Sequence, residues 1–592
     1  MKRLIPIVFA LVACVATSVR AHDAKRLEAS TFMRKSQLPD LRVSYQTLAP
    51  HTMTHGAPVV TLTVTNERPE RRRLTVMVAH AGSVRRTLVV EPSASVTADF
   101  VGPVVSHQSC HDQGLVYVTE AGSSVGSLRV GYIDCYLRRQ DDKLNVLIGP
   151  AIDGISTVAA YSHADEEAGK AKTGKTLAGE FYFYTQALGP AGWSADTRAY
   201  SGYDLVLLTA AEWAGLPGGA RRALVGYAAQ GGSLVLCGES ELPIEARGFP
   251  AGAVTVAVDA DRVRAVGRGC IVLAPAPGAD RRPPLTRNDL VRLGRATRTA
   301  LQKSYVENTD LGPTLGELPS LDLPSVPVSL VMLLLAVFAL GVVPTVLFFC
   351  VRRQKRLAAL VVLPLVSAAI GVVVVLGMLG VYGVTPHLNQ VSTVLLNADD
   401  RRAAVFTKAC VFAPTDVTDR LRFAREAHVV TVGARKSDYR WCSTDRDGNL
   451  CLEPGDTLSA RGRDWLETLK PVVYATSALC DTPARLAVEE LAADRLKVTN
   501  LLGAPVTELT VADSKGRLFA GKGIADGATC ELTPGGDRAV FDALGATNVS
   551  VRACYRADLS ACPFLPDLLG GTPAKRTSQT TVFGRYGKEV SE

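Results

Sequence analysis

The sequence predicts a multidomain fold: an N-terminal β-sandwich, an α/β domain with a parallel sheet, a two-helix transmembrane hairpin and a C-terminal β-sandwich-like region. Three observations predict it. Short β-branched segments separated by turn residues occur near both ends of the chain, apolar strands flank a helical pattern at 203–237, and two uncharged stretches of 24 and 28 residues occupy 328–351 and 357–384. A chain of 592 residues is long enough for three to five units at about 150 residues each.

Residues 1–21 have the pattern of a secretory signal peptide. Lys2 and Arg3 precede a short apolar run, and Val19 and Ala21 place small residues before the expected cleavage point after Ala21. The segment ending in Cys14 also fits a lipoprotein signal, in which Cys14 would carry the lipid.

The first folded unit, 40–137, is expected to be a β-sandwich. Its segment 59–65 is rich in β-branched residues, and 73–78 alternates between polar and apolar side chains. Three further short segments follow at 86–90, 115–118 and 127–132 with Gly, Pro, Asn or Ser between them. Strands at this spacing are typical of a sandwich.

The second unit, 143–275, has a different pattern. Its segments 145–148, 203–208 and 233–237 are nearly continuous apolar runs, and a helical pattern begins at Pro217 and ends at Gly231. Apolar strands separated by a helix predict a parallel sheet covered by helices on its faces.

Residues 276–327 are expected to form a basic amphipathic helix (281–302) and a stiff Pro-rich stalk. Each of the stretches 328–351 and 357–384 is long enough to span a bilayer. The loop between them, 352–356, contains four basic residues, which favour the cytoplasmic side. The sequence therefore predicts an inner-membrane protein with two spans and with its N- and C-terminal domains outside the cytoplasm.

Strand patterns return after the predicted hairpin, and two β-rich domains are expected at 388–480 and 484–592. No repeat of fixed period is apparent. Eleven of the thirteen cysteines lie in the predicted outside regions, where disulfides persist. Sequence does not determine their pairing. The disulfide candidates are Cys110 and Cys135 around a strand pair, Cys237 and Cys270 in the α/β domain, and Cys442 and Cys451 around a turn.

Several motifs point to chemistry that their context does not support. Residues 169–176 match the phosphate-binding loop pattern. However, the polar, acidic segment 163–168 precedes them instead of the buried strand that such a loop leaves, so no nucleotide and no cofactor is expected. The net charge of +8 is scattered, and its longest pure basic run, 71–73, is too short for a nucleic-acid footprint.

Two clusters contain possible metal ligands. His107, Cys110, His111 and Asp112 lie close together, but a zinc site needs three or four well-placed ligands and no second cluster accompanies them. Residues 445–449 resemble part of a calcium loop without its bidentate Glu, so a hairpin turn is expected there. No metal site is predicted.

Cys237 ends an apolar strand and precedes Gly238, Glu239 and Ser240. Together with 203–208 and 217–230, the stretch 231–238 resembles the class I glutamine amidotransferase-like fold, in the version found in exported domains of bacterial membrane proteins of unknown function. The segments 498–505 and 513–518 are also similar to such proteins. The resemblance implies a Cys nucleophile in the turn after this strand, with a His and a Glu from later in the domain. Here Gly238 stands at the nucleophile position, and no His lies between Cys237 and His387.

The sequence therefore predicts no catalytic site, with Cys237 as a weak candidate. The expected function is that of a non-enzymatic, membrane-anchored envelope protein acting as an interaction or assembly scaffold. The resemblance implies partners in the envelope, with von Willebrand A domain proteins as one class. The alternatives are an exported cysteine hydrolase or amidotransferase that uses Cys237, and an extracytoplasmic receptor for a sugar or peptide ligand.

Overall fold

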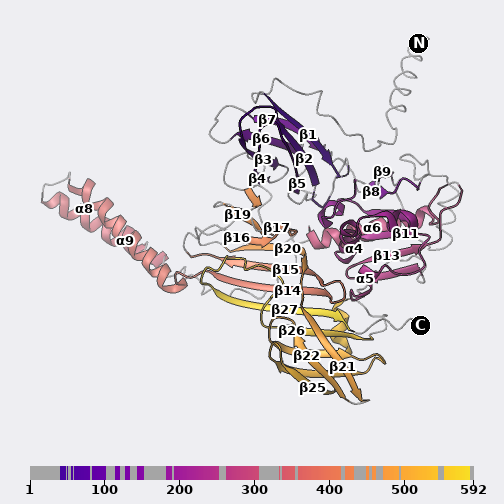
Figure 1. Ribbon diagram of the computed structural model, residues 1–592. Helices are drawn as coiled ribbons and strands as arrows, with labels where there is room; N and C mark the ends of the chain where they lie inside the picture. Colours follow the sequence, from indigo (N-terminus) through magenta and orange to yellow (C-terminus); the bar gives the residue numbers. More distant parts are fainter. Residues whose placement is uncertain are drawn as a thin grey trace, which may run out of the picture.

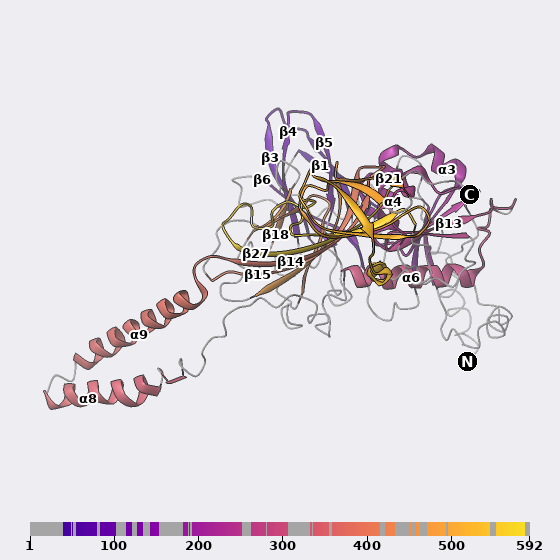
Figure 2. The ribbon, with the colours of Figure 1, turned by 90° about the horizontal axis from the view of Figure 1, so that it is seen from below.

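The computed structural model contains four β-sheets, flanked on one side by a pair of projecting helices (Figures 1 and 2). The signal-peptide segment, the phosphate-loop pattern, the His107–Asp112 cluster and most of the stalk lie outside the described residues. The structure describes residues 40–48, 50, 55–57, 59–79, 83–101, 114–120, 127–133, 143–152, 182–187, 189, 192–251, 262–279, 281–305, 332–333, 336–353, 358–414, 421–432, 449–452, 457–461, 471–492, 495–544 and 552–586.

The N-terminal strands form a sandwich of two antiparallel sheets. Inward-facing side chains such as Val60, Leu62 and Val64 are fully buried and pack against Leu74 and Val76 of the opposite sheet. This alternation follows from the two-residue period of a strand. One sheet has the order β1 (Leu41–Thr47), β2 (Val59–Asn66), β5 (Ser95–Val101), and the other contains β4 (Ser83–Val90), β3 (Arg72–Ala79), β6 (Gly114–Glu120), β7 (Ser127–Ile133).

Three strands from much later in the chain extend this sandwich. β18 (Asn449–Leu452) pairs in parallel with β4, with Leu450 opposite Val84. β19 (Thr457–Arg461) and β16 (Leu421–Ala424) continue the same sheet. The N-terminal sandwich is therefore completed by the region after residue 384.

The α/β domain contains a six-stranded sheet in which all strands but β12 are parallel. Alternate residues of its central strands face the helix α4 on one side and α6 on the other. Such strands are buried on both faces and are therefore apolar throughout. The sheet order is β12 (Val263–Val266), β13 (Gly269–Ala274), β11 (Ser233–Cys237), β10 (Leu205–Thr209), β8 (Lys143–Ile148), β9 (Tyr182–Ala187); the helices are η2 (Thr197–Tyr200), α3 (Ala210–Gly215), α4 (Gly218–Ala229), α5 (Ile244–Arg247) and α6 (Arg287–Tyr305).

The basic helix expected from the sequence is α6, and it is part of the α/β domain. Its residues Leu290, Val291 and Leu293 are buried in one apolar cluster with Leu205 and Leu207 of β10.

The C-terminal region forms the largest sheet. β14 (His387–Asn397) pairs in parallel with β27 (Lys575–Arg585) over ten residue pairs. On its other side β14 pairs with β15 (Arg402–Phe412). The remaining strands are β17 (His428–Val432), β20 (Val472–Asp481), β21 (Arg485–Ala492), β22 (Arg495–Leu501), β23 (Val506–Ala512), β24 (Leu518–Ile524), β25 (Thr529–Pro534) and β26 (Cys554–Leu559); the 3-10 helix η7 (Arg538–Leu544) lies before β26.

Strands β1–β7 and β21–β27 form two copies of one sandwich. The pairing β1-β2-β5 with β4-β3-β6-β7 recurs as β21-β22-β25 with β24-β23-β26-β27. Asn66 and Asn500 occupy the same corner of each copy. Each side-chain amide donates to the carbonyls four, 24 and 25 residues ahead, and each Oδ1 accepts from the amide two residues ahead. This repeat has no fixed period in the sequence and was not predicted.

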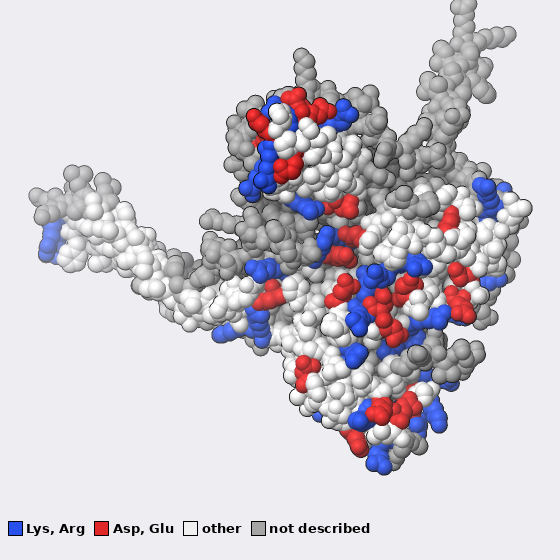
Figure 3. Space-filling view, viewed as in Figure 1, with Lys and Arg blue, Asp and Glu red and all other residues white. Residues whose placement is uncertain are grey.

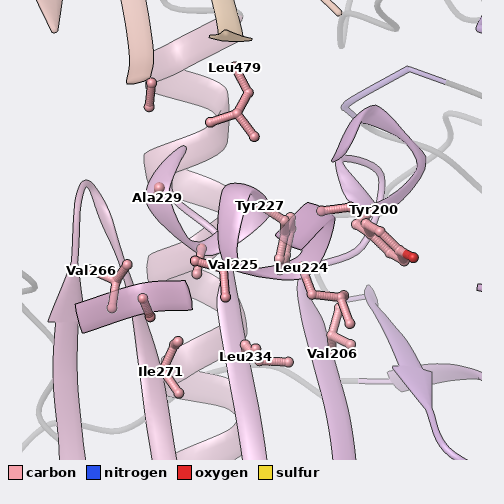
Figure 4. Packing of buried hydrophobic residues seen from close by; sticks show 14 of the residues in the cluster. Tyr200, Val206, Leu224, Val225, Tyr227, Ala229, Leu234, Val266, Ile271 and Leu479 are labelled. Atoms are coloured by element: carbon pink, nitrogen blue, oxygen red, sulfur yellow. The ribbon is translucent and has the colours of Figure 1, made fainter. Parts of the chain in front are cut away.

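The α/β domain packs on the C-terminal sheet through α4. Figure 4 shows Leu479 of β20 above Ala229, Val225 and Leu224 of that helix. Polar contacts surround this apolar contact. Arg402 Nη1 donates to the Arg222 carbonyl at 2.8 Å, and Asn397 Nδ2 donates to the Glu245 carbonyl at 2.9 Å.

The predicted transmembrane hairpin is wrong for the part of the chain that the structure describes. The first stretch contains the short π-helix η5 (Phe338–Val342), which is followed directly by the ten-residue helix α8 (Val343–Arg352). The second forms α9 (Ala358–Tyr382), which contains Pro364. Among the described residues, no helix combines the length and apolar character needed to cross a membrane.

The membrane-hairpin part of the predicted fold class and the two-span inner-membrane location are therefore both overturned. The helices α8 and α9 project from the rest of the molecule (Figures 1 and 2). Several of their apolar side chains are exposed, among them Leu347, Phe348 and Leu365.

The disulfide prediction is also contradicted. Cys237 and Cys270 are free thiols on neighbouring strands. Cys270 is opposite Ser233, whereas Cys237 is opposite Ala274. This four-residue offset separates the two Cα atoms by about 13 Å along the strands, beyond the roughly 7 Å limit of a disulfide. Cys110, Cys135 and Cys442 lie outside the described residues, as does the side chain of Cys451.

Candidate functional site

The carboxyl edge of the parallel sheet is the place to look for a site, because ligands of open α/β sheets bind outside the carboxyl ends of the strands. Cys237 lies at this edge as the last residue of β11, between Thr209 of β10 and Ala274 of β13. The next residue, Gly238, has a φ of +93°, a left-handed conformation that favours glycine. The position at which a nucleophile would be expected is therefore occupied by Gly238, which has no reactive side chain.

The Cys237 thiol is poorly suited to nucleophilic chemistry. Its side chain is 1% exposed. Burial, together with the nearby Glu212 carboxylate, raises the pKa of the thiol to about 11. Because the thiolate is the nucleophile, a thiol with this pKa is almost entirely protonated at neutral pH.

Glu212 of α3 fills the space between the ends of β8 and β10. Its carboxylate accepts hydrogen bonds from the amide of Ala151 at 2.7 Å and from the amide and hydroxyl of Thr209 at 2.8 Å each. Thr209 in turn caps the helix by accepting from the Glu212 amide, so the pair forms a reciprocal capping box. In the sheet order β11-β10-β8-β9, the chain places β9 on one side of β8 and then places β10 and β11 on the other side. The space between the ends of β8 and β10 is therefore the topological switch point of the sheet. The amides that could contact an anionic ligand there already bind the protein's own carboxylate.

The histidines with described positions do not complete a catalytic set with Cys237. His55 lies beside Asp204, which directly precedes β10 and so marks the amino end of the sheet. Cys237 pairs with Thr209, which lies five residues after Asp204 along β10. Asp204 and Cys237 are therefore about 16 Å apart along the strand direction. His387 begins β14 and contacts the ring of Phe412, and His428 belongs to β17.

A buried ion pair occupies the amino end of the sheet. Arg298 of α6 donates through Nε and Nη2 to the two carboxylate oxygens of Asp204, at 2.9 and 2.8 Å. The Asn145 amide donates to the same carboxylate at 2.7 Å. His55 Nε2 is 3.8 Å from Asp204, and burial lowers the pKa of its imidazole to about 4, so His55 is neutral at pH 7.

This ion pair lies where the N-terminal sandwich docks. The segment between β1 and β2 reaches into the α/β domain, where the Ala57 amide donates to Ser201 Oγ at 2.8 Å and the Tyr203 hydroxyl donates to the Leu48 carbonyl. Gly56, with a φ of +84°, lies against the backbone of Ser201 and Gly202, where a Cβ atom would not fit. These groups are therefore structural.

A second set of ionisable side chains lies where the α/β domain contacts the C-terminal sheet. We call it the interface charge cluster; it contains Asp196, Arg198, Arg402, Glu426, His428 and Asp481. Arg198 forms a bidentate pair with Asp196, at 3.1 and 2.7 Å. Burial and the Arg198 charge lower the pKa of His428 to about 3, and burial raises that of Glu426 to about 7.

A small cavity of about 30 Å³ lies in the C-terminal region, lined in part by Gln390, Arg422 and Tyr474. This volume is sufficient for about one or two water molecules and is far below that of a substrate pocket.

The described residues also contain no group of three or more His, Cys, Asp or Glu side chains arranged to hold a metal ion. Over the described surface in Figure 3, basic and acidic side chains are intermixed, without a broad basic face.

Comparisons with known proteins add little. No protein-family model matches the chain, and no curated protein matches it. Among solved structures, a calcium-binding mutant of Bacteroides uniformis beta-glucuronidase 2 is similar at 8% identity and a TM-score of 0.12. The match covers 33% of this chain and 23% of that protein, and it carries no argument about fold or function.

Sequence reasoning singled out Cys237 and missed both buried charge clusters. Asp204 was part of the predicted strand 203–208, and an ionisable residue within an otherwise apolar buried run is a usable signal. Glu426 and His428 lie within the β-rich domain expected at 388–480, without any local sign that another domain covers them.

Proposed function

We propose that this protein is a non-catalytic scaffold that holds other proteins in an assembly. The observation that carries the proposal is the filled carboxyl edge of the parallel sheet. Glu212 accepts three hydrogen bonds at the switch point, and the neighbouring Cys237 is a buried thiol with a raised pKa. An amidotransferase-like reaction would need an exposed thiolate and a base at that edge.

The connections between domains also support a scaffold. The α/β domain is fixed to the N-terminal sandwich through Tyr203 and Ser201, and to the C-terminal sheet through Leu479 and Arg402. β18 joins the first sandwich to the last third of the chain. Domains joined through buried contacts keep a fixed relative geometry, which suits a platform for partners better than a hinged enzyme cleft.

Quantitative co-purification tests the proposal. The full-length chain, tagged and expressed at its native level in its natural source, is crosslinked and recovered under denaturing conditions. We expect at least one partner in constant molar ratio to the chain, with unchanged recovery for Cys237→Ala. Protein purified separately under native conditions, without crosslinking, is assayed for ammonia release from glutamine and for ester hydrolysis.

Turnover that Cys237→Ala removes while folding and partner recovery are retained would replace the scaffold with the cysteine hydrolase. Absence of any partner in constant ratio, with no turnover, would also contradict the proposal.

A further inference from the structure

The contact between the α/β domain and the C-terminal sheet contains a carboxyl group with a buried oxygen that has no hydrogen-bond partner. Glu426 lies in the turn between β16 and β17, which is closed by a hydrogen bond from the Ala427 amide to the Ala424 carbonyl at 3.0 Å. Its Oε2 atom is buried and has no hydrogen-bond partner. Burying this oxygen without a partner costs more for the ionised carboxylate than for the protonated carboxyl.

The charges that face Glu426 come from three other elements. Asp196 is the N-cap of η2 and Arg198 lies within that helix. Arg402 is the first residue of β15, and Asp481 is the last residue of β20. The two arginines already have partners: Arg198 binds Asp196 in a bidentate pair, and Arg402 donates to the Arg222 carbonyl and lies 3.5 Å from Asp481. Asp196 and Asp481 would repel an ionised Glu426, whereas Arg198 and Arg402 would attract it, and burial of the carboxyl outweighs all four charges.

His428, on the strand after this turn, does not offset that charge. It is 2% exposed, and burial together with Arg198 lowers the pKa of its imidazole to about 3. It is thus neutral throughout the range in which Glu426 titrates. Arg222 and Asp400 complete the set of charges around Arg402.

We propose that Glu426 is a proton-controlled latch, which holds the α/β domain on the C-terminal sheet when protonated and loosens that contact when ionised. Burial raises the pKa of Glu426 to about 7 from the model-compound value of 4.5. Because the folded-state pKa is the higher one, the stabilising contribution is complete below about pH 4.5. It falls as the pH rises through about 7 and is lost above that. This inference concerns the joint between domains and does not depend on the scaffold proposal.

Hydrogen exchange of the full-length protein tests the latch. Exchange is followed by mass spectrometry at about pH 5.5 and about pH 8 and corrected for the intrinsic pH dependence of the chemistry. We expect peptides covering 192–200 and 421–432 to lose protection by about tenfold at the higher pH, since each pKa unit corresponds to a tenfold change in equilibrium. Peptides covering β11, inside the α/β domain, should keep their protection.

Glu426→Gln keeps a neutral side chain of the same shape at every pH, so this variant should stay protected at both values. Glu241→Gln is the matched control, because Glu241 is an exposed carboxylate paired with Arg247 on the α/β domain, and it should respond as the wild type does. A wild-type response retained by Glu426→Gln overturns the proposal. If that variant does not fold, the wild-type titration decides alone: the absence of a transition centred between about pH 6 and about pH 8 also overturns it.

Discussion

At the scale of single residues, several polar side chains of this protein bind the protein itself. Glu212 receives hydrogen bonds from two backbone amides, Asp204 binds Arg298, and Asn66 and Asn500 each satisfy three carbonyls. Buried polar groups are tolerated when they are satisfied in this way, because leaving one unpaired costs roughly 1–3 kcal/mol.

The Cys237 thiol should resist alkylation in the native protein. It is 1% exposed and its pKa is raised to about 11, so little thiolate is present at neutral pH and reagent does not reach it. With iodoacetamide and detection by mass spectrometry, Cys530, which is partly exposed, should react before Cys237. Cys237→Ser should cost roughly 1–3 kcal/mol and Cys237→Ala less. Labelling of Cys237 ahead of the other cysteines would contradict this account.

The Asp204–Arg298 pair should be among the most sensitive in the protein. Arg298→Met leaves the buried Asp204 carboxylate without its cation, which should cost about 3–5 kcal/mol. Replacing both residues, as Asp204→Asn with Arg298→Met, should cost less than the single change. The exposed pair Lys497–Glu489 gives the control: Lys497→Met should change stability by less than about 1 kcal/mol. Native-state hydrogen exchange measures the first effect at the amides of β8 and β10 and the control at the amides of β21 and β22, and equal effects would refute the difference.

At the scale of secondary-structure elements, the two sandwiches share strand order and differ in their connections. The β21–β22 connection is a tight hairpin in which Ala492 pairs with Arg495. The corresponding β1–β2 connection runs from Leu48 to Val59 and supplies Gly56 and Ala57 to the α/β domain. A longer loop costs little extra closure entropy. The N-terminal copy therefore uses its longer loop to dock a neighbouring domain.

The repeated asparagine corner should matter equally in both copies. Asn66→Ala and Asn500→Ala each remove the donors to three backbone carbonyls and the acceptor for one amide. Each should destabilise its own sandwich by at least about 1–3 kcal/mol. Thr499→Ala, which removes only an exposed hydroxyl pair with Thr529, is the matched control and should be nearly neutral. Hydrogen exchange resolved by domain distinguishes the two copies. A large loss in one copy and none in the other would argue against equivalent corners.

At the scale of the whole molecule, the chain crosses between its domains several times. β16, β18 and β19 leave the C-terminal region to extend the N-terminal sheet, and β14 pairs with β27, which lies almost two hundred residues later. One apolar cluster joins α4 to β15, β20 and β27 through Leu224, Phe406, Leu479 and Phe583. Unfolding of one part should therefore weaken the others.

Acid should destabilise the assembled protein through its two buried histidines. Burial lowers the pKa of His55 to about 4 and that of His428 to about 3, from 6.5. Since the folded-state pKa values are the lower ones, the stabilisation is complete above about pH 6.5 and is lost as the pH falls through about 4 and about 3. His428→Gln should flatten the pH dependence of the urea midpoint between about pH 6 and about pH 4, and His55→Gln with His428→Gln should flatten it further. If the slope of the urea midpoint against pH is unchanged in the double variant, these histidines are not the cause of the acid sensitivity.

Local pattern in the sequence indicated much of the secondary structure. The segment expected at 59–65 is β2, the run 233–237 is β11, and the helix expected from Pro217 is α4, because apolar spacing reports directly on which side chains face a core. The burial of Cys237 followed in the same way from the apolar residues before it. The spans at 328–351 and 357–384 were assigned from the same kind of pattern and were wrong, because a long uncharged run does not establish a helix long and apolar enough to cross a membrane.

Only the tertiary structure decided which elements meet. A two-residue period tells which face of a strand is buried, but not which strand lies beside it, so the addition of β18 to β4 and the parallel pairing of β14 with β27 were not predictable. The repeat of the sandwich was not predictable either, because it is defined by strand pairings and its two copies share few residues. The charge clusters around Asp204 and Glu426 depend on contacts between distant segments, because a carboxylate acquires an unusual environment only when another domain removes it from water.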